Sequence, residues 1–148
     1  MALVHGCIHG VIRKFVAIGV LLGLMSNAFA ADYTIIANKS VSAGSLGKNE
    51  LQAIFLGEKT KWDDGKPIKI VVLEDGNAHK AFLKNVIGKT PSQFENYWKK
   101  QIFTGKAAAP KSFGEMSSLV DYVAGQAGAI GYVAGGQSTG STKSITIK

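Results

Sequence analysis

The stretch with the clearest chemical potential lies at residues 68–82, where a short apolar run meets a polar turn. The run is rich in Val and Ile, as is typical of a strand that is covered on both faces, and Glu74-Asp75-Gly76-Asn77 supply turn residues. In open α/β sheets, ligands bind at the carboxyl ends of strands, near helix N-termini whose free N–H groups favour anions. The stretch therefore fits an anion site, although an ordinary strand–turn–helix corner has the same pattern.

Catalytic and metal-binding patterns are incomplete around this stretch. His79 is the only histidine after residue 30, so a Ser-His-Asp triad would have to centre on it, and no nucleophile–base arrangement can be assembled around it. Asp75 and His79 are four residues apart and could share a metal ion, but no third ligand accompanies them. We therefore predict a protein that is not an enzyme and that uses no metal or other cofactor.

The first thirty residues have the pattern of a secretory signal peptide. Arg13 and Lys14 precede an apolar run at residues 15–25, and Ala28 and Ala30 are small residues at the two positions that a signal peptidase recognises. The run is shorter than the roughly 20 residues that a comfortable membrane span needs. We expect cleavage after residue 30, a periplasmic product, and no membrane insertion of that product.

Cleavage would also remove the most obvious metal ligands. His5, Cys7 and His9 alternate like a small metal cluster, but all three lie in the segment that should be removed. The predicted product, a single domain at residues 31–148, contains no cysteine, which excludes disulfides, thiol catalysis and cysteine-ligated zinc. Its 15 basic and 10 acidic residues include no arginine and form no basic helix face, so nucleic acid is not an expected partner.

The remaining pattern predicts four strands and four helices. Residues 38–47 are polar and rich in Gly and Ser, so we expect them to form a surface connection. The element order favours a small α/β sandwich with a mixed sheet of about four strands. Strands are expected at Tyr33–Ala37, at residues 68–73, at residues 129–133 and, as the last edge strand, at Lys143–Ile147.

Two helices are expected to begin with capping boxes. Thr90 has the position of an N-cap, with Pro91 in the first helical position and Gln93 three residues after the cap. Residues 112–115 have a similar Ser-x-x-Glu pattern. We therefore expect one helix from residue 91 and a second helix that begins with the box at residues 112–115 and continues through Met116, Leu119, Val120 and Val123.

The large aromatic residues are assigned to the core. Phe94, Trp98 and Ile102 recur at helical spacing, and this spacing favours a stripe that faces the core over a cofactor site. Trp62 stands alone before the central strand and is expected to pack on the domain.

Several motifs follow one another in a characteristic order. They are Ile54-Phe55-Leu56-Gly57, Trp62-Asp63-Asp64-Gly65-Lys66-Pro67, Glu74-Asp75-Gly76-Asn77-Ala78 and Gly128-Ala129-Ile130-Gly131-Tyr132-Val133. This series resembles the phosphate-binding branch of the type 2 periplasmic binding proteins, the solute receptors of ABC importers, over about residues 33–133. Two further runs, Gly88-Lys89-Thr90-Pro91 and Phe103-Thr104-Gly105-Lys106, resemble short exported members of that superfamily. The resemblance implies a three-layer α/β sandwich, one lobe of that fold with a small mixed sheet.

The resemblance also implies where a ligand would bind. In the phosphate binders, the loop after the central strand has an arginine and a Gly-Ser-Gly-Thr turn that hold the phosphate. The corresponding loop here has neither an arginine nor a hydroxyl, and Glu74 and Asp75 would repel an anion. The candidate ligand-binding residues by this correspondence are Gly76, Asn77, Ala78, His79 and Lys80.

The sequence thus predicts an exported domain that is related to phosphate receptors and binds an anion weakly or in an altered way. Full-length relatives close two lobes around the anion, whereas residues 31–148 can supply one. A small, phosphate-like inorganic anion is the expected ligand, and an ABC permease is the partner that the family implies. The alternative is a ligand-free interaction module that docks onto another envelope protein.

Overall fold

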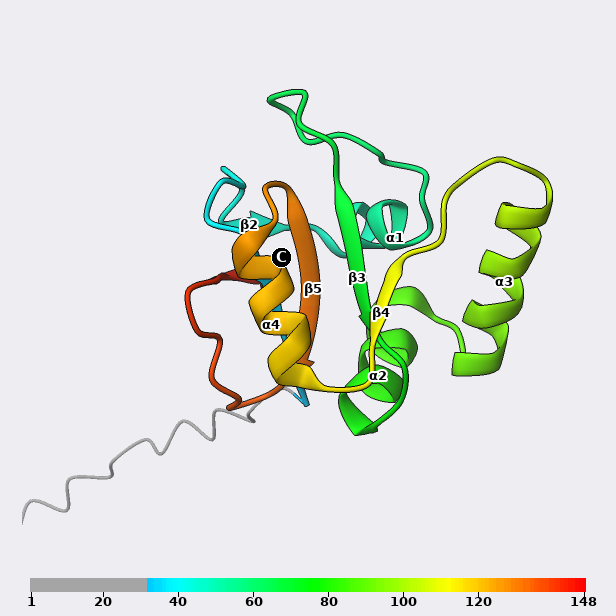
Figure 1. Ribbon diagram of the computed structural model, residues 1–148. Coiled ribbons are helices and arrows are strands. Elements are labelled where there is room, and N and C mark those ends of the chain that lie inside the picture. The colour runs from blue at the N-terminus through cyan, green and yellow to red at the C-terminus, as the bar shows by residue number, and fades with distance from the viewer. Residues whose placement is uncertain (1–31) are drawn as a thin grey trace, which may run out of the picture.

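The computed structural model describes residues 32–148, and the predicted signal peptide with His5, Cys7 and His9 lies outside them. In the described part, a six-stranded mixed sheet has the order β2-β6-β1-β5-β3-β4 (Figure 1). The strands are β1 (Tyr33–Ala37), β2 (Ser45–Leu46), β3 (Lys69–Leu73), β4 (Lys111–Phe113), β5 (Ala129–Ala134) and β6 (Lys143–Ile147).

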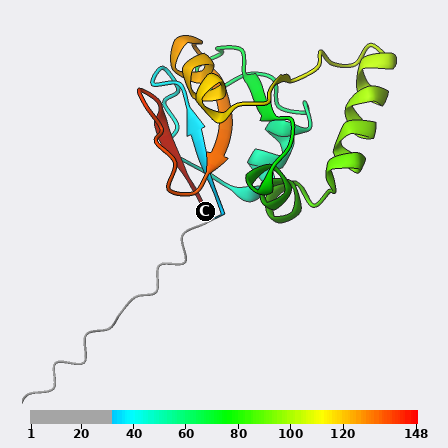
Figure 2. The same cartoon turned by 60° about the horizontal axis from the view of Figure 1, so that its bottom comes forward.

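The helices cover both faces of this sheet. Helix α4 packs on one face, and α1 and α2 lie on the opposite face, while α3 stands beside the sheet beyond β4 (Figures 1 and 2). The predicted three-layer α/β sandwich is therefore confirmed, but the sheet has six strands instead of about four, because the short strands β2 and β4 were not predicted. The helices are α1 (Lys48–Phe55), α2 (Asn77–Phe82), which continues into the π-helical segment η1 (Leu83–Ile87), α3 (Pro91–Phe103) and α4 (Met116–Gly125).

Successive residues of β5 face the two helical layers on opposite sides of the sheet. The Tyr132 ring stacks on Phe82 of α2 with a centroid distance of 4.0 Å. The preceding residue, Gly131, faces the opposite layer. A Cβ added to it would lie 3.2 Å from the Leu119 side chain of α4 and 3.1 Å from the carbonyl oxygen of Val71. Successive side chains of a strand point to opposite faces, so glycine at residue 131 allows α4 to approach the sheet closely.

The direction of the strands decides where the loops meet. Strands β4, β3 and β5 run parallel to one another, with Val71 opposite Lys111 and Ile70 opposite Ile130. Their carboxyl ends therefore lie at one edge of the sheet, which is where ligands bind in open α/β folds. The loop after β3 and the loop after β4 lead from this edge into α2 and α4.

Two predictions need correction, one about the last strand and one about the segment that follows the first strand. β6 is not an edge strand, because the two-residue strand β2 pairs with it on its outer side. Residues 38–47 are not only a surface connection, since they contain β2 and bury Val41 and Leu46. The spacing of Val41 and Leu46 matches neither the period of a strand nor that of a helix, so the sequence pattern could not predict that they are buried.

The predicted capping boxes had different outcomes. In α3, the backbone N–H of Gln93 donates to Thr90 Oγ1 at 3.2 Å, and the N–H of Thr90 donates to Gln93 Oε1 at 3.0 Å. The box predicted at residues 112–115 is wrong: Ser112 lies in β4, and the N-cap residue of α4, Glu115, makes no side-chain capping bond. Pairing with β3 keeps Ser112 extended.

The core assignments hold for two of the three residues in the α3 stripe. Phe94 and Trp98 are each 5% exposed, but Ile102 is 47% exposed and its assignment to the core is wrong. The last turn of α3 stands away from the sheet, so Ile102 has little to pack against (Figure 1). Trp62 is buried as predicted, and its indole N–H donates to the carbonyl of Gly128 at 2.9 Å.

A search of residues 32–148 for helices that could cross a bilayer found none of sufficient length and apolarity.

Candidate functional site

The candidate site lies where α2 and α4 begin, at the carboxyl edge of the sheet. A cavity of about 520 Å³ opens there. Gly76 makes the turn from β3 possible, because its φ of +105° lies in a region that other residues rarely adopt. The lining residues come from the loop after β3, from the start of α4 and from the end of β5: Leu73, Asp75, Gly76, Asn77, Ala78, Gly114, Glu115, Met116 and Ala134.

Three of the five candidate residues, Gly76, Asn77 and Ala78, line this cavity. The first residues of a helix have backbone N–H groups without an acceptor inside the helix. In α2 the N–H of Lys80 is bonded, since it donates to the carbonyl of Gly76 at 3.1 Å. The N–H groups before Lys80 remain available for an anion.

Charged side chains around the cavity oppose such an anion. Asp75 and Glu115 are among the lining residues, and no lysine or arginine is. Lys80 lies close by, with its Nζ 3.9 Å from Asp75 Oδ1, but it lines a neighbouring concavity. The cavity therefore offers backbone donors and the Asn77 amide without a cationic side chain, and its two carboxylates would repel phosphate.

His79 is buried and makes its contacts away from the cavity. Its Nδ1 lies 2.6 Å from the hydroxyl of Tyr132, which also accepts the backbone N–H of Leu73 at 3.2 Å. The N–H of Leu73, the hydroxyl of Tyr132 and Nδ1 of His79 all have partners if the hydroxyl donates its proton to Nδ1, which places the imidazole proton on Nε2. Burial lowers the pKa of His79, Asp75 acts in the opposite direction, and Lys80 lowers the pKa further. His79 is therefore a neutral residue that connects α2 to β5.

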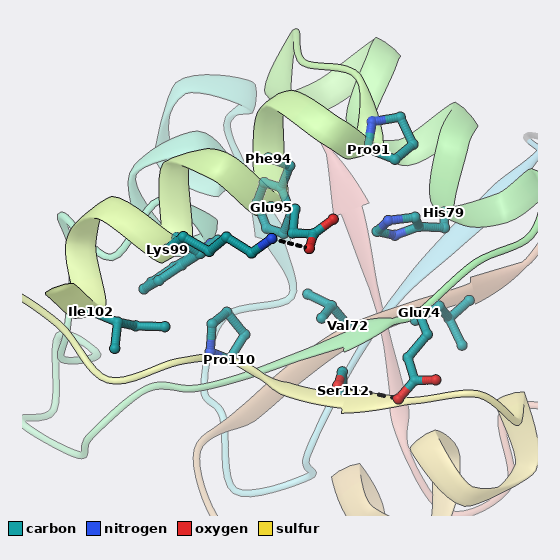
Figure 3. Close-up of a pocket in the computed structure, with 12 residues that line it drawn as sticks. Val72, Glu74, His79, Pro91, Phe94, Glu95, Lys99, Ile102, Pro110 and Ser112 are labelled. Carbon is teal, nitrogen blue, oxygen red and sulfur yellow. Dashed lines mark hydrogen bonds and ion pairs between the residues drawn. The ribbon is translucent and has the colours of Figure 1, made fainter.

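The free edge of the His79 ring faces a groove between α3 and the sheet (Figure 3). This groove has a volume of about 430 Å³, and its walls include Val72 and Phe94. The ion pair between Lys99 and Glu95, 2.6 Å long, lies along its rim (Figure 3). Trp98 also lines the groove, and its Nε1 is buried without a hydrogen-bond partner in the described part of the chain.

Asp75 and His79, the candidate metal pair, have no third ligand in the described part of the chain. The Asp75 side chain is 84% exposed and His79 is buried, and residues 32–148 contain no group of three His, Cys, Asp or Glu side chains that could hold a metal ion. The run from Gly136 to Gly140 has the spacing Gly-x-Ser-x-Gly around Ser138. It forms an exposed loop between β5 and β6, whereas a nucleophile elbow requires a turn from a strand into a helix.

Comparison with known proteins assigns the fold. A family model described as the PBP superfamily domain matches residues 25–145, most of the chain. The chain belongs to this family. A search of curated proteins found no match.

Solved structures of phosphate-binding proteins share the PBP fold seen here. PstS from Borrelia burgdorferi matches with a TM-score of 0.60 and 15% identity, over 79% of this chain and 47% of that protein. A phosphate-binding protein from Stenotrophomonas maltophilia matches with a TM-score of 0.58 and 20% identity, over 80% of this chain and 39% of that protein. An ABC-type phosphate transport receptor from Vibrio cholerae matches with a TM-score of 0.53 and 16% identity, over 78% of this chain and 46% of that protein. The chain thus spans less than half the length of each of these proteins.

The chain therefore shares its fold with phosphate-binding proteins, as the sequence motifs suggested. Sequence reasoning gave His79 and Lys80 the same role as Gly76, Asn77 and Ala78. The structure separates them into the core and a neighbouring concavity. It also adds Gly114, Glu115 and Met116 to the cavity, which the sequence analysis missed.

Proposed function

We propose that this PBP domain binds a small, phosphate-like anion weakly at the start of α2. The observation that supports this most is the position of Gly76, Asn77 and Ala78, which line a cavity at the carboxyl edge of the sheet. The fold is shared with phosphate receptors, and helix N-termini at this edge suit anions.

The expected affinity is millimolar or weaker. Tight binding needs several converging donors and burial of most of the ligand, whereas one lobe surrounds the anion on one side. Asp75 and Glu115 add repulsion, and no cationic side chain among the lining residues offsets it. A dissociation constant of about 1 mM corresponds to only about 4 kcal/mol.

Export to the periplasm and delivery of the anion to an ABC permease belong to the same proposal. Their support comes from the signal-peptide pattern of residues 1–30 and from membership of the PBP family. The domain would then act as a receptor without a catalytic step.

Thermal unfolding of the exported protein with and without phosphate tests the binding proposal. With a dissociation constant of about 5 mM, 50 mM phosphate stabilises the folded state by about 1.4 kcal/mol, which raises Tm by about 6 °C. Sodium chloride of equal ionic strength is the reference. The substitution Asn77→Asp adds a negative charge to the cavity and should abolish most of the rise.

Asn49→Asp is the matched control. It makes the same chemical change in the first turn of another helix, α1, at an exposed residue outside the cavity. Any general salting effect of phosphate acts on both variants alike. An equal rise of Tm in wild type, Asn77→Asp and Asn49→Asp would contradict binding at the start of α2.

The second candidate function is a ligand-free module that docks onto another envelope protein. It is favoured by the groove beside α3, with its apolar walls, and by Phe103, which is 92% exposed at the end of that helix. If phosphate caused no spectroscopic change at residues 75–80, the docking function would become the better one.

A further inference from the structure

The lysines that the anion cavity lacks gather one helical turn further along α2. We propose that this second concavity, here called the lysine basin, binds ligands with several phosphoryl charges. Its volume is about 390 Å³. Its lining residues are Lys80, Lys84, Gly88, Lys89, Thr90, Pro91 and Gln93.

The chain path brings the three lysines of the basin together. Lys80 and Lys84 are four residues apart along α2 and η1 and line the same concavity. Gly88 ends η1 with φ of +74°, and its N–H donates to the carbonyl of Leu83 at 2.7 Å. This left-handed turn directs Lys89 and the start of α3 back towards the same concavity.

The capping box of α3 leaves donors at the rim of the basin. Thr90 Oγ1 already accepts the N–H of Gln93, and Gln93 Oε1 already accepts the N–H of Thr90. What remains is the hydroxyl proton of Thr90 and the amide NH₂ of Gln93, and both groups donate. The basin therefore presents hydroxyl, amide and ammonium donors, which match phosphoryl oxygens.

None of the residues that line the basin is acidic. Residues 76–94 contain no Asp or Glu. Asp75 lies 3.9 Å from Lys80 Nζ, but the two side chains are 84% and 61% exposed, so this pair holds the lysine only weakly. Glu95 is paired with Lys99 and lines the groove of Figure 3 instead.

Lys89 is also oriented by its surroundings. Its ammonium group lies 5.7 Å from the centre of the Tyr97 ring, in a cation–π contact that limits its freedom. An exposed lysine contributes little to binding a single charge, so an anion with one charge gains little here. A ligand with several linked charges meets all three lysines at once, and this favours oligophosphates and phosphoryl headgroups over orthophosphate.

Titration of the exported protein with tripolyphosphate at low ionic strength tests this proposal. The expected result is saturable shifts of the amide signals of Lys84, Lys89 and Thr90. The double variant Lys84→Gln, Lys89→Gln should weaken binding about 25-fold, from about fivefold for each surface charge removed. Lys48→Gln is the matched control, because Lys48 is exposed at the start of α1, outside the basin, and it should change the affinity less than twofold.

A second experiment distinguishes soluble oligophosphates from lipid headgroups as the source of the phosphoryl groups. Co-sedimentation with phosphatidylcholine vesicles containing phosphatidylglycerol measures binding to headgroups, and the double lysine variant should reduce it. Loss of either interaction in that variant supports the basin. The proposal is overturned if wild type binds neither probe, or if Lys48→Gln weakens binding as much as the double variant, which would show unspecific attraction to net charge.

Binding in the lysine basin and binding at the start of α2 can be refuted independently of each other. Asn77→Asp should weaken the response to orthophosphate and leave the lysine shifts with tripolyphosphate in place. Because Lys84 is exposed and Lys89 half-buried on the surface, the double variant should melt within about 2 °C of wild type, which shows that a loss of binding is not a loss of fold.

Discussion

The hydroxyl of Tyr132 offers the sharpest test of how α2 is fixed to the sheet. Tyr132→Phe removes one oxygen atom and nearly conserves volume, so no sizeable cavity forms. It leaves two buried groups without a partner, the N–H of Leu73 and Nδ1 of His79. Either tautomer of His79 leaves Nδ1 unpaired in the variant, so a proton shift on the ring cannot repair the loss.

The cost follows from these two groups. A buried polar group without a partner costs about 1–3 kcal/mol, so the loss of both partners in Tyr132→Phe should lower the free energy of unfolding by about 2–6 kcal/mol. Domains of this size are stable by about 5–15 kcal/mol in total, and the effect is therefore large. Urea unfolding followed by tryptophan fluorescence measures it, with an unchanged m-value expected because the exposed surface is the same.

Tyr122→Phe is the control for this variant. Tyr122 is half-buried against Phe113, and its hydroxyl makes no hydrogen bond within residues 32–148, so its loss should change the free energy by less than about 0.5 kcal/mol. A Tyr132→Phe effect as small as that of Tyr122→Phe would refute the hydrogen-bonded connection. Nitrogen chemical shifts of His79 in wild type should in addition show the proton on Nε2.

Three further outcomes are expected. Gly128→Ala should lower the free energy of unfolding in urea by at least about 2 kcal/mol, because φ is +78° and a Cβ would lie 2.2 Å from the carbonyl oxygen of Pro67. Gly136→Ala is the control: φ is +77° but no atom lies within 4 Å of the added Cβ, so the loss should be about 1 kcal/mol. Trp98→Ala should lower the free energy of unfolding by about 3–5 kcal/mol, and a loss below 1 kcal/mol would mean that the α3 stripe is not core. The unfolded chain protonates His79 near pH 6.5 and the folded protein only at lower pH, so stability should fall as pH drops below about 6.5 and level off below the folded pKa; His79→Gln should reduce this slope between pH 7.5 and pH 5.

Local chemistry explains what could be predicted from sequence. The Thr90–Gln93 box is decided within four residues, and its two hydrogen bonds form as expected. The corner between β3 and α2 follows from Gly76, which alone among its neighbours tolerates a φ of +105°. Both features are independent of the rest of the fold, and a single sequence is enough to find them.

Contacts between distant residues explain what could not be predicted. His79 faces the core because it meets Tyr132, 53 residues away in sequence, and one helical residue further on Lys80 faces the basin. Strand β4 has three residues, Lys111–Phe113, and exists because β3 pairs with it. Such a short segment has no period of its own, so the Ser-x-x-Glu pattern at residues 112–115 suggested a helix start instead.

Residue-resolved titration with phosphate measures directly whether an anion binds at the start of α2. In amide spectra of the exported protein, the signals of Gly76, Asn77 and Ala78 should shift together and saturate with a dissociation constant of about 1 mM or weaker. No cationic side chain lines the cavity beside Asp75 and Glu115, so micromolar affinity would contradict weak binding at this site. Unmoved signals at these three residues in 50 mM phosphate would contradict it equally.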